Sequence, residues 1–342
     1  MKLAIAGPHL LQTDEAQAKQ AQLLSERLPA TLITYPSNPD SNADALTFES
    51  NPTNSLNRLR LYFFFKRSSK TFDRIILPGT INNSLFRVFP AKKCIPLISK
   101  RLLEETHEEK QAFLKLSQQF PLILVQSKHL ITQLKQLGIS ESKIHFFYPL
   151  TDDFSCPPKK DRSFTLLFAS SPRGPEQECA SRFQAKGVNI LLEACRTIRM
   201  TLLVLWRNDY AQQFKDLAKS LQPTCDIAFV NKHLQSTQDY FAMSSAIVVP
   251  YTSLHQSPEY PLSAIQSLAC GKPVVCTTIP EFSSIIKKHG CGVNCDPDSD
   301  SLGEAIKKVS KMKPNHSLCR ETFEHYFLID EAKIKDLQQV LF

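Results

Sequence analysis

Two runs of alternating strand and helix patterns constrain the fold of this 342-residue chain more than any other feature. In each run, short apolar strand patterns are separated by amphipathic helix patterns. Parallel strands need a crossover connection, which is usually a helix, so such runs predict a parallel sheet with helices on both faces. The sequence therefore predicts an α/β chain with two Rossmann-like domains facing a cleft, and ligands at the carboxyl ends of the strands.

The two runs predict the following elements. In the first run we expect strands at residues 2–6, 31–35, 74–78, 94–99, 122–126 and 143–148, and helices at residues 14–28, 56–68, 105–119 and 128–137. In the second run we expect strands at residues 164–169, 201–205, 226–230, 246–250 and 273–277, and helices at residues 188–199, 210–221, 237–243, 262–269, 283–288 and 302–309. The C-terminal residues indicate two further helices, broken near residues 328–330.

Prolines and charges interrupt the pattern between the two runs, in the sequence CPPKKD at residues 156–161. This composition is typical of a domain linker. We therefore predict a first domain over residues 1–155, a linker over residues 156–163 and a second domain over residues 164–328.

Composition narrows the class of protein. The formal charge is +8, but the sequence has no zinc finger, basic-region heptad or aromatic RNP-like strand, so we expect no nucleic-acid partner. The N-terminal sequence MKLAIAGPH fits a first strand better than a signal peptide, and no run of 18 apolar residues occurs, so we expect a cytoplasmic protein. The ten cysteines form no C-x-x-C pair, which predicts reduced thiols and no zinc site.

The sequence PEYPLSAIQSLACGKPVV, at residues 258–275, predicts a loop, a helix and a buried strand in immediate succession. Apolar residues recur at helical spacing over residues 262–269, Gly271 ends the helix, and Pro273 opens the strand. A helix N-terminus carries unpaired N–H groups and a partial positive charge. The stretch therefore predicts a site for a phosphate or for sugar hydroxyls, or else an ordinary α/β turn.

This stretch and its surroundings resemble the donor half of the family 4 retaining glycosyltransferases, which have the GT-B fold. The sequence ACGKPVV, at residues 269–275, aligns with the family's motif without gaps, and Pro280-Glu281 falls on its P-E pair. Upstream, Lys186-Gly187 followed by VNILLEA resembles the family's K-G-x-D-x-L-I-E-A. The similarity covers about residues 120–330.

The resemblance implies an enzyme that moves a hexose-type sugar from a nucleoside-diphosphate sugar to a glycan or glycolipid acceptor. The second domain would bind the donor, the first would bind the acceptor, and the last helix, at residues 329–342, would cross back to the first domain. Neither a cofactor nor a metal is expected, because side-chain cations and helix ends can stabilise the leaving diphosphate.

The resemblance also assigns site residues. Lys186 and an arginine upstream of it would contact the diphosphate, and both Arg182 and Arg173 remain candidates for that arginine. Arg207 follows the strand at residues 201–205, so it is either a further donor-binding residue or a surface arginine. The other donor-binding residues that the resemblance implies are Gly187, Leu262, Ser263 and Gln266.

The chain departs from the family at two glutamates that are separated by seven residues. Pro258 aligns with the first and Gln266 with the second, so either Glu259 takes the first role as a catalytic residue or that role is vacant. The family's N-domain histidine has no match either. The alternative function is therefore a catalytically silent GT-B scaffold that binds a sugar nucleotide or a protein.

The sequence LNRLRLYFFFKRSSK, at residues 56–70, has five bases, no acids and four consecutive aromatic residues. It predicts either peripheral contact with an anionic membrane face or a core helix whose Leu and Phe side chains face the sheet. In the second interpretation, which we favour, the basic side chains reach solvent; they are Arg58, Arg60, Lys66 and Arg67.

A short acidic sequence contains Asp296, Asp298 and Asp300. We expect these residues to form the turn before the next helix, in which Ser301 and Glu304 make a capping box. No metal site is predicted here.

Overall fold

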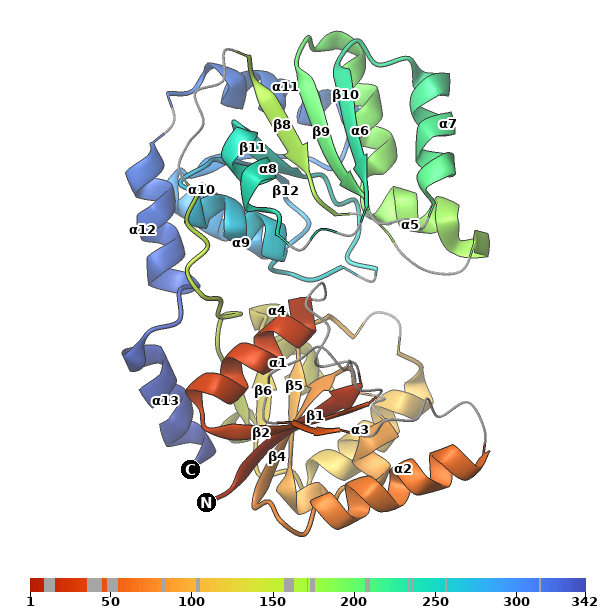
Figure 1. The fold of residues 1–342 in the computed structure, drawn as a ribbon, viewed down its shortest axis with the longest axis vertical. Helices are drawn as coiled ribbons and strands as arrows, with labels where there is room; N and C mark the ends of the chain where they lie inside the picture. Colours follow the sequence, from red (N-terminus) through yellow and green to blue (C-terminus); the bar gives the residue numbers. More distant parts are fainter. Residues whose placement is uncertain are drawn as a thin grey trace. The chain divides into compact units, whose positions relative to one another are not determined.

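The computed structural model describes residues 1–8, 16–35, 45–47, 55–81, 84–102, 105–156, 163–170, 172, 176–206, 210–232, 234, 236–255, 257–313 and 315–342. The chain divides into two compact units (Figure 1). The first unit comprises Met1–Asp152 and Ile329–Phe342, and the second comprises Asp153–Leu328. Most of the predicted linker, residues 157–162, lies outside the described residues.

The first unit contains a parallel sheet in the order β3-β2-β1-β4-β5-β6-β7. Its strands are β1 (Leu3–Pro8), β2 (Ala30–Tyr35), β3 (Ala45–Thr47), β4 (Arg74–Gly79), β5 (Cys94–Ile98), β6 (Ile123–Val125) and β7 (Ile144–Phe146). Its helices are α1 (Ala16–Arg27), α2 (Ser55–Ser68), α3 (His107–Ser117), α4 (Lys128–Gln136) and α13 (Glu331–Leu341). The predicted strands of the first run are all present, and β3 is an additional edge strand.

Alternating side chains of the strands fill two cores, one on each face of this sheet. Along β1, Ala4 belongs to the core that α2, α3 and α4 cover, whereas Ile5 belongs to the core that α1 and α13 cover. This period of two explains why strands that are buried on both faces are continuously apolar in the sequence.

Helix α13 packs on the first unit although the chain reaches it from the second. Leu337 and Leu341 are buried in the same core as Ile5, and the Ile329 N–H donates to the Thr151 carbonyl oxygen at 2.9 Å. The two termini consequently lie near each other in Figure 1.

The second unit contains a parallel sheet in the order β10-β9-β8-β11-β12-β13. Its strands are β8 (Thr165–Phe168), β9 (Thr201–Trp206), β10 (Asp226–Asn231), β11 (Ala246–Val249), β12 (Val274–Thr277) and β13 (Gly292–Cys295). Its helices are α5 (Cys179–Ala185), α6 (Val188–Ala194), α7 (Ala211–Leu221), α8 (Gln238–Met243), α9 (Leu262–Ala269), α10 (Phe282–His289), α11 (Ser299–Lys311) and α12 (His316–Tyr326).

Three local predictions for the second unit need correction. The helix expected at residues 188–199 ends at Ala194 and continues as a 3-10 turn, and the sequence analysis missed α5 and β13. Helix α11 begins earlier than predicted, because the Asp298 carboxylate accepts from the Ser301 N–H at 2.8 Å. Asp298 is therefore the N-cap, and Glu304 instead contacts Lys307 within the helix.

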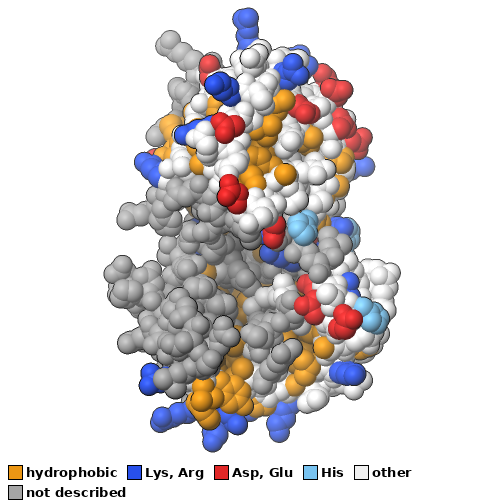
Figure 2. Space-filling model, turned by 90° about the vertical axis from the view of Figure 1, so that its right-hand side faces the viewer, with side chains coloured by type: hydrophobic (Ala, Val, Ile, Leu, Met, Phe, Trp, Pro, Cys, Tyr) orange, Lys and Arg blue, Asp and Glu red, His pale blue; other side chains and the backbone are white. Residues whose placement is uncertain are grey.

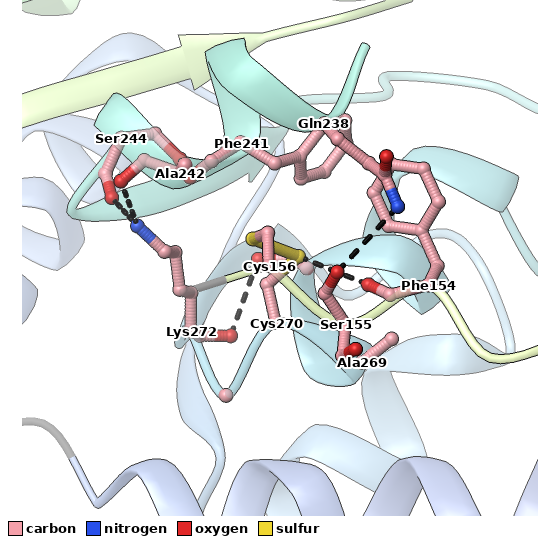
Figure 3. Close-up of a disulfide and its surroundings, with 12 residues drawn as sticks. Phe154, Ser155, Cys156, Gln238, Phe241, Ala242, Ser244, Ala269, Cys270 and Lys272 are labelled. Atoms are coloured by element: carbon pink, nitrogen blue, oxygen red, sulfur yellow. Dashed lines mark hydrogen bonds between the residues drawn. A yellow bond between two sulfur atoms is a disulfide. The ribbon is translucent and has the colours of Figure 1, made fainter. Parts of the chain in front are cut away.

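The prediction that all ten cysteines are reduced is wrong for one pair. Cys156 and Cys270 form a disulfide, while the other eight are free (Figure 3). Their Cα atoms are 5.1 Å apart, a separation that suits a disulfide. The sequence could not predict the pair because 114 residues separate its members.

Helix α2 only partly follows the favoured interpretation. Leu61 and Phe65 are buried in the core, but three apolar side chains face solvent; they are Leu59, Tyr62 and Phe63. Arg60, Lys66 and Arg67 are exposed as predicted, and the side chain of Arg58 lies outside the described residues. No helix within the described ranges combines the length and the apolar character needed to cross a membrane.

Candidate functional site

The candidate site lies at the carboxyl edge of the second sheet, where the strand order reverses. Strand β8 pairs with β9 on one side and with β11 on the other, so the connections leaving β8 and β11 diverge. Such a switch point leaves a crevice beyond the strand ends. Two hydroxyl groups meet there, since Ser170 Oγ and Tyr251 Oη are 2.9 Å apart.

The turn between α5 and α6 carries Lys186 and Gly187 to this edge. The Lys186 N–H donates to the Arg182 carbonyl oxygen at 3.0 Å, which ends α5. Gly187 has a φ of +69°, and a Cβ at this position would lie 1.6 Å from the Pro250 carbonyl oxygen. Only glycine fits both constraints, so the K-G pair brings the start of α6 directly against the end of β11.

The loop after β11 is hydrogen-bonded to the turn that carries Lys186. The Thr252 N–H donates to the Ala185 carbonyl oxygen at 3.1 Å, and Thr252 Oγ1 donates to the Gln184 carbonyl oxygen at 2.5 Å. The backbone that carries Lys186 is therefore held by hydrogen bonds to a neighbouring strand end.

Tyr251 is a site residue that the sequence analysis did not identify. Its ring lies below Lys186, with Nζ 4.6 Å from the ring centroid, and only 2% of the residue is exposed. Burial raises the pKa of its phenol to about 12, so the hydroxyl stays neutral. Thr277 Oγ1 also donates to the Tyr251 carbonyl oxygen at 2.6 Å. The sequence did offer one indication of this role, because Tyr251 directly follows the strand predicted at residues 246–250.

Arg182 lies one helical turn before Lys186 but is paired within its own helix region. Its Nε donates to Glu178 Oε2 at 2.8 Å, and the arginine side chain is only 13% exposed. The structure thus places Arg182 near the K-G turn with its charge compensated. Arg173 and Arg207 lie outside the described residues, so the choice between Arg173 and Arg182 stays open.

Helix α9 has the predicted bounds, and three predicted donor-binding residues form its half-exposed face: Leu262, Ser263 and Gln266. The helix begins after Pro261, whose side chain cannot cap it. The Pro261 carbonyl oxygen accepts hydrogen bonds from the N–H groups of Ala264 and Ile265. Among the described residues, the Leu262 and Ser263 N–H groups have no acceptor. The N-terminus of α9 is therefore open to an external anion.

Glu259 serves the next helix. The residue is fully buried, and its Oε2 accepts from the Glu281 N–H at 2.7 Å at the start of α10. Its backbone carbonyl oxygen accepts from the Phe282 N–H at 3.1 Å. These contacts fix the loop before α9 to the N-terminus of α10, so Glu259 has a clear structural role. Its direct role in catalysis stays a prediction.

Lys272, from the ACGKPVV motif, is also structural. Its buried ammonium donates to the Ala242 carbonyl oxygen at 2.8 Å and to the Ser244 carbonyl oxygen (Figure 3). These carbonyl groups lie at the C-terminal end of α8, where the helix dipole favours a cation. The motif therefore joins α8 to the chain that enters β12.

Comparisons with known proteins agree with this geometry. Residues 178–311, which lie within the second unit, match the family Glycosyl transferases group 1. The solved structure of a sucrose-phosphate synthase from Thermosynechococcus elongatus is similar, with a TM-score of 0.77 at 14% identity, over 99% of this chain and 98% of that chain. No curated protein matches the sequence significantly.

Two further solved structures share the fold over nearly the whole chain. HepE from Anabaena, in complex with UDP-glucose, has a TM-score of 0.75 at 14% identity and covers 99% of this chain and 98% of that chain. WaaG, a glycosyltransferase involved in lipopolysaccharide biosynthesis, has a TM-score of 0.70 at 14% identity, with 99% of each chain covered.

The two Rossmann-like units and the site at the switch point define the fold, which is that of the GT-B glycosyltransferases. More particularly, residues 178–311 of the second unit are similar to the family Glycosyl transferases group 1. The predicted fold class and the predicted family resemblance are both confirmed.

Proposed function

We propose that this protein is a retaining glycosyltransferase that moves a hexose from a nucleoside-diphosphate sugar to a hydroxyl group of a glycan or glycolipid acceptor. The observation that carries the proposal is the Lys186 ammonium fixed above the buried, neutral Tyr251 at the switch point. The open N-terminus of α9, which follows the same strand, supports it. HepE was solved with UDP-glucose, which makes UDP-glucose the first donor to test.

In the proposed reaction, the bond between the anomeric carbon and the diphosphate oxygen breaks, and the acceptor oxygen bonds to the same face of that carbon. The diphosphate keeps the bonding electron pair and takes up the proton of the acceptor hydroxyl. Negative charge therefore builds on the leaving diphosphate. The Lys186 ammonium and the amides of Leu262 and Ser263 are suited to stabilise this charge.

The proposal assigns no step to a metal ion. The positive charge that a divalent cation supplies in other enzymes would come here from Lys186 and from the open helix end. Gln266, on the same face of α9, would donate or accept hydrogen bonds with the ribose hydroxyls.

The test of the donor site is isothermal titration calorimetry of UDP, UDP-glucose and GDP-mannose with the Lys186→Ala variant. We expect affinity for the preferred nucleotide to fall about tenfold or more, because a charge-assisted contact to phosphate is lost. The matched control is Lys308→Ala, which removes an exposed lysine on α11. Equal binding by the wild type and the Lys186→Ala variant would contradict the proposed donor site.

A turnover assay separates transfer from binding alone. Gln266 and the buried Glu259 stand at or near the two positions where the resembling family has glutamates, and these departures favour a scaffold that binds without transfer. Release of UDP from UDP-glucose, measured with a panel of glycan and glycolipid acceptors, would support the enzyme. Tight nucleotide binding with no release on any donor would favour the silent scaffold.

A membrane-bound acceptor is supported by the exposed face of α2. Leu59 and Phe63 are 52% and 57% exposed, and Tyr62 is 36% exposed. Arg60, Lys66 and Arg67 of α2 are also exposed. Figure 2 shows hydrophobic and basic side chains gathered in the lower part of the first unit, where Figure 1 places this helix. An apolar strip flanked by cations suits the surface of an anionic bilayer.

Flotation with vesicles that contain an anionic phospholipid tests this contact. A variant with Arg60→Gln, Lys66→Gln and Arg67→Gln should lose about two orders of magnitude in partitioning, since each basic residue contributes about 1 kcal/mol near such a surface. The control carries Lys307→Gln, Lys308→Gln and Lys311→Gln on α11 of the second unit. Unchanged flotation of the α2 variant would rule out the membrane contact.

A further inference from the structure

Nine of the ten cysteines lie in the second unit, yet only one pair is bonded. A protein that used disulfides as a scaffold would bond most of its cysteines. Here the eight free thiols include Cys94 and Cys295, whose pKa burial raises to about 12, and Cys276, whose pKa burial also raises well above its usual value. Such thiols stay protonated and react slowly. Cys291 differs from them, because a hydrogen bond with Cys319 lowers its pKa to about 7. The structure nevertheless bonds only Cys156 to Cys270 and leaves the other eight cysteines free.

The bond connects two functionally placed segments. Cys270 is the C-cap of α9, the helix whose other end carries the candidate donor-binding residues. Cys156 lies in the first residues of the second unit, which begins at Asp153. In Figure 3 this segment runs beside the end of α9 and beneath α8. A bond here restrains α9 at the end opposite to the donor site.

Other contacts hold the same segment without the bond. The Arg320 guanidinium binds both carboxylate oxygens of Asp153, at 2.6 and 3.0 Å, and donates to the Ala269 carbonyl oxygen at 3.1 Å. The Phe154 ring packs edge-on against Phe241, with centroids 5.2 Å apart. The segment and the helix end thus have anchors that do not include the disulfide.

The reduced form is also accommodated. Cys270 Sγ lies 3.2 Å from the Phe154 carbonyl oxygen, so a Cys270 thiol has an acceptor in place (Figure 3). The pair can therefore exist as a disulfide or as two thiols with the same neighbours. A site that tolerates both forms is suited to reversible oxidation.

We propose that Cys156 and Cys270 form a reversible redox modification site that controls the order of α9 and, through it, donor affinity. The oxidant is a small-molecule disulfide such as oxidised glutathione. The two thiols lose two protons and two electrons as the S–S bond forms, and the glutathione disulfide is reduced to two thiols. Reduction by a dithiol runs the reverse exchange. The effect on donor affinity rests on the proposed function, whereas the bond and its effect on α9 do not.

The experiment compares the full chain after oxidised glutathione with the same chain after dithiothreitol. Alkylation in denaturant, read by mass spectrometry, should add eight groups to the oxidised chain and ten to the reduced one. A digest of the oxidised chain should also contain a peptide in which a disulfide links Cys156 to Cys270. Amide hydrogen exchange over residues 262–270 should be about fivefold faster in the reduced form, and affinity for UDP-glucose about fivefold lower.

Variants locate the response. Cys156→Ser and Cys270→Ser should each exchange and bind like the reduced wild type and ignore the redox treatment. The control Cys179→Ser removes a free cysteine on α5 and should keep the full response. Ten alkylations under both conditions, or equal exchange in both forms, would overturn the site. Failure to bind any nucleotide sugar, with the exchange response intact, would overturn the proposed function and leave the redox site standing.

Discussion

Helices α9 and α10 follow neighbouring strands of one sheet, yet the protein treats their N-termini in opposite ways. At α10 the first amides all find acceptors inside the protein: Glu259 serves those of Glu281 and Phe282, and the Pro280 carbonyl oxygen serves that of Ser283. At α9 the first two amides, of Leu262 and Ser263, find none among the described residues.

The two helices show how a helix N-terminus that can bind a ligand differs from one that is satisfied within the protein. Both helices have eight residues, and each N-terminus carries a similar partial positive charge. What differs is whether the chain itself supplies the negative group. Since α10 has a buried carboxylate of its own, only α9 can offer its dipole and amides to a diphosphate. Changes at α10 should therefore alter stability, and changes at α9 should alter binding.

The largest expected effect is on stability, from Glu259→Ala. The change removes the charged acceptor of the Glu281 N–H at a fully buried position, so the free energy of unfolding should fall by about 2 kcal/mol. Urea denaturation measures it, with Glu304→Ala as the control for an exposed glutamate. Affinity for UDP-glucose should change little. A loss of affinity or turnover larger than the loss of folded protein would instead give Glu259 a direct role at the site.

A smaller effect, on binding, is expected from Leu262→Pro. Proline is tolerated at the first position of a helix, and the change removes one open N–H while keeping the backbone. Affinity for the nucleotide should fall about fivefold, as expected for one lost hydrogen bond to a charged group, with the stability of the protein nearly unchanged. Calorimetry with Leu262→Ala, which keeps the amide, is the matched control. Equal affinities of the two variants would show that this helix end does not bind the donor.

The smallest expected effect is that of metal removal. If Lys186 and α9 supply the charge that the diphosphate needs, dialysis against EDTA should leave nucleotide affinity and UDP release within about twofold of the untreated protein. Readdition of Mg²⁺ or Mn²⁺ provides the control. A large loss that these ions restore would mean that the open helix end and Lys186 are insufficient.

Much of the fold could be predicted from the sequence because it depends on local patterns. The bounds of α9 agree at every residue, since apolar periodicity, a preceding proline and a following glycine all act within a few positions. The elements that were missed are short: α5 has seven residues, β13 has four, and β3 has three at the sheet edge. Such segments carry too few side chains for a period to show, and their pairing with neighbouring strands defines them.

The candidate site was predicted less completely. The K-G pair and the helix at residues 262–269 were recognised from motifs that lie close together in sequence. Tyr251 was missed because its importance comes from Ser170, Lys186 and Thr277, which other strands and turns bring to it. The helix-capping role of Glu259 was missed for the same reason, since its partner amide is 22 residues away.

The sequence by itself determined the two parallel α/β units and the location of the helix at residues 262–269, because these depend on periodicity. It also determined the tight turn at Gly187, because few residues other than glycine allow that backbone conformation. Only the tertiary structure decided which helix end is open, which tyrosine supports the lysine and which two of ten cysteines meet. These three features depend on contacts between residues far apart in the chain. The residues next to each side chain in the sequence do not indicate which distant residue it will contact.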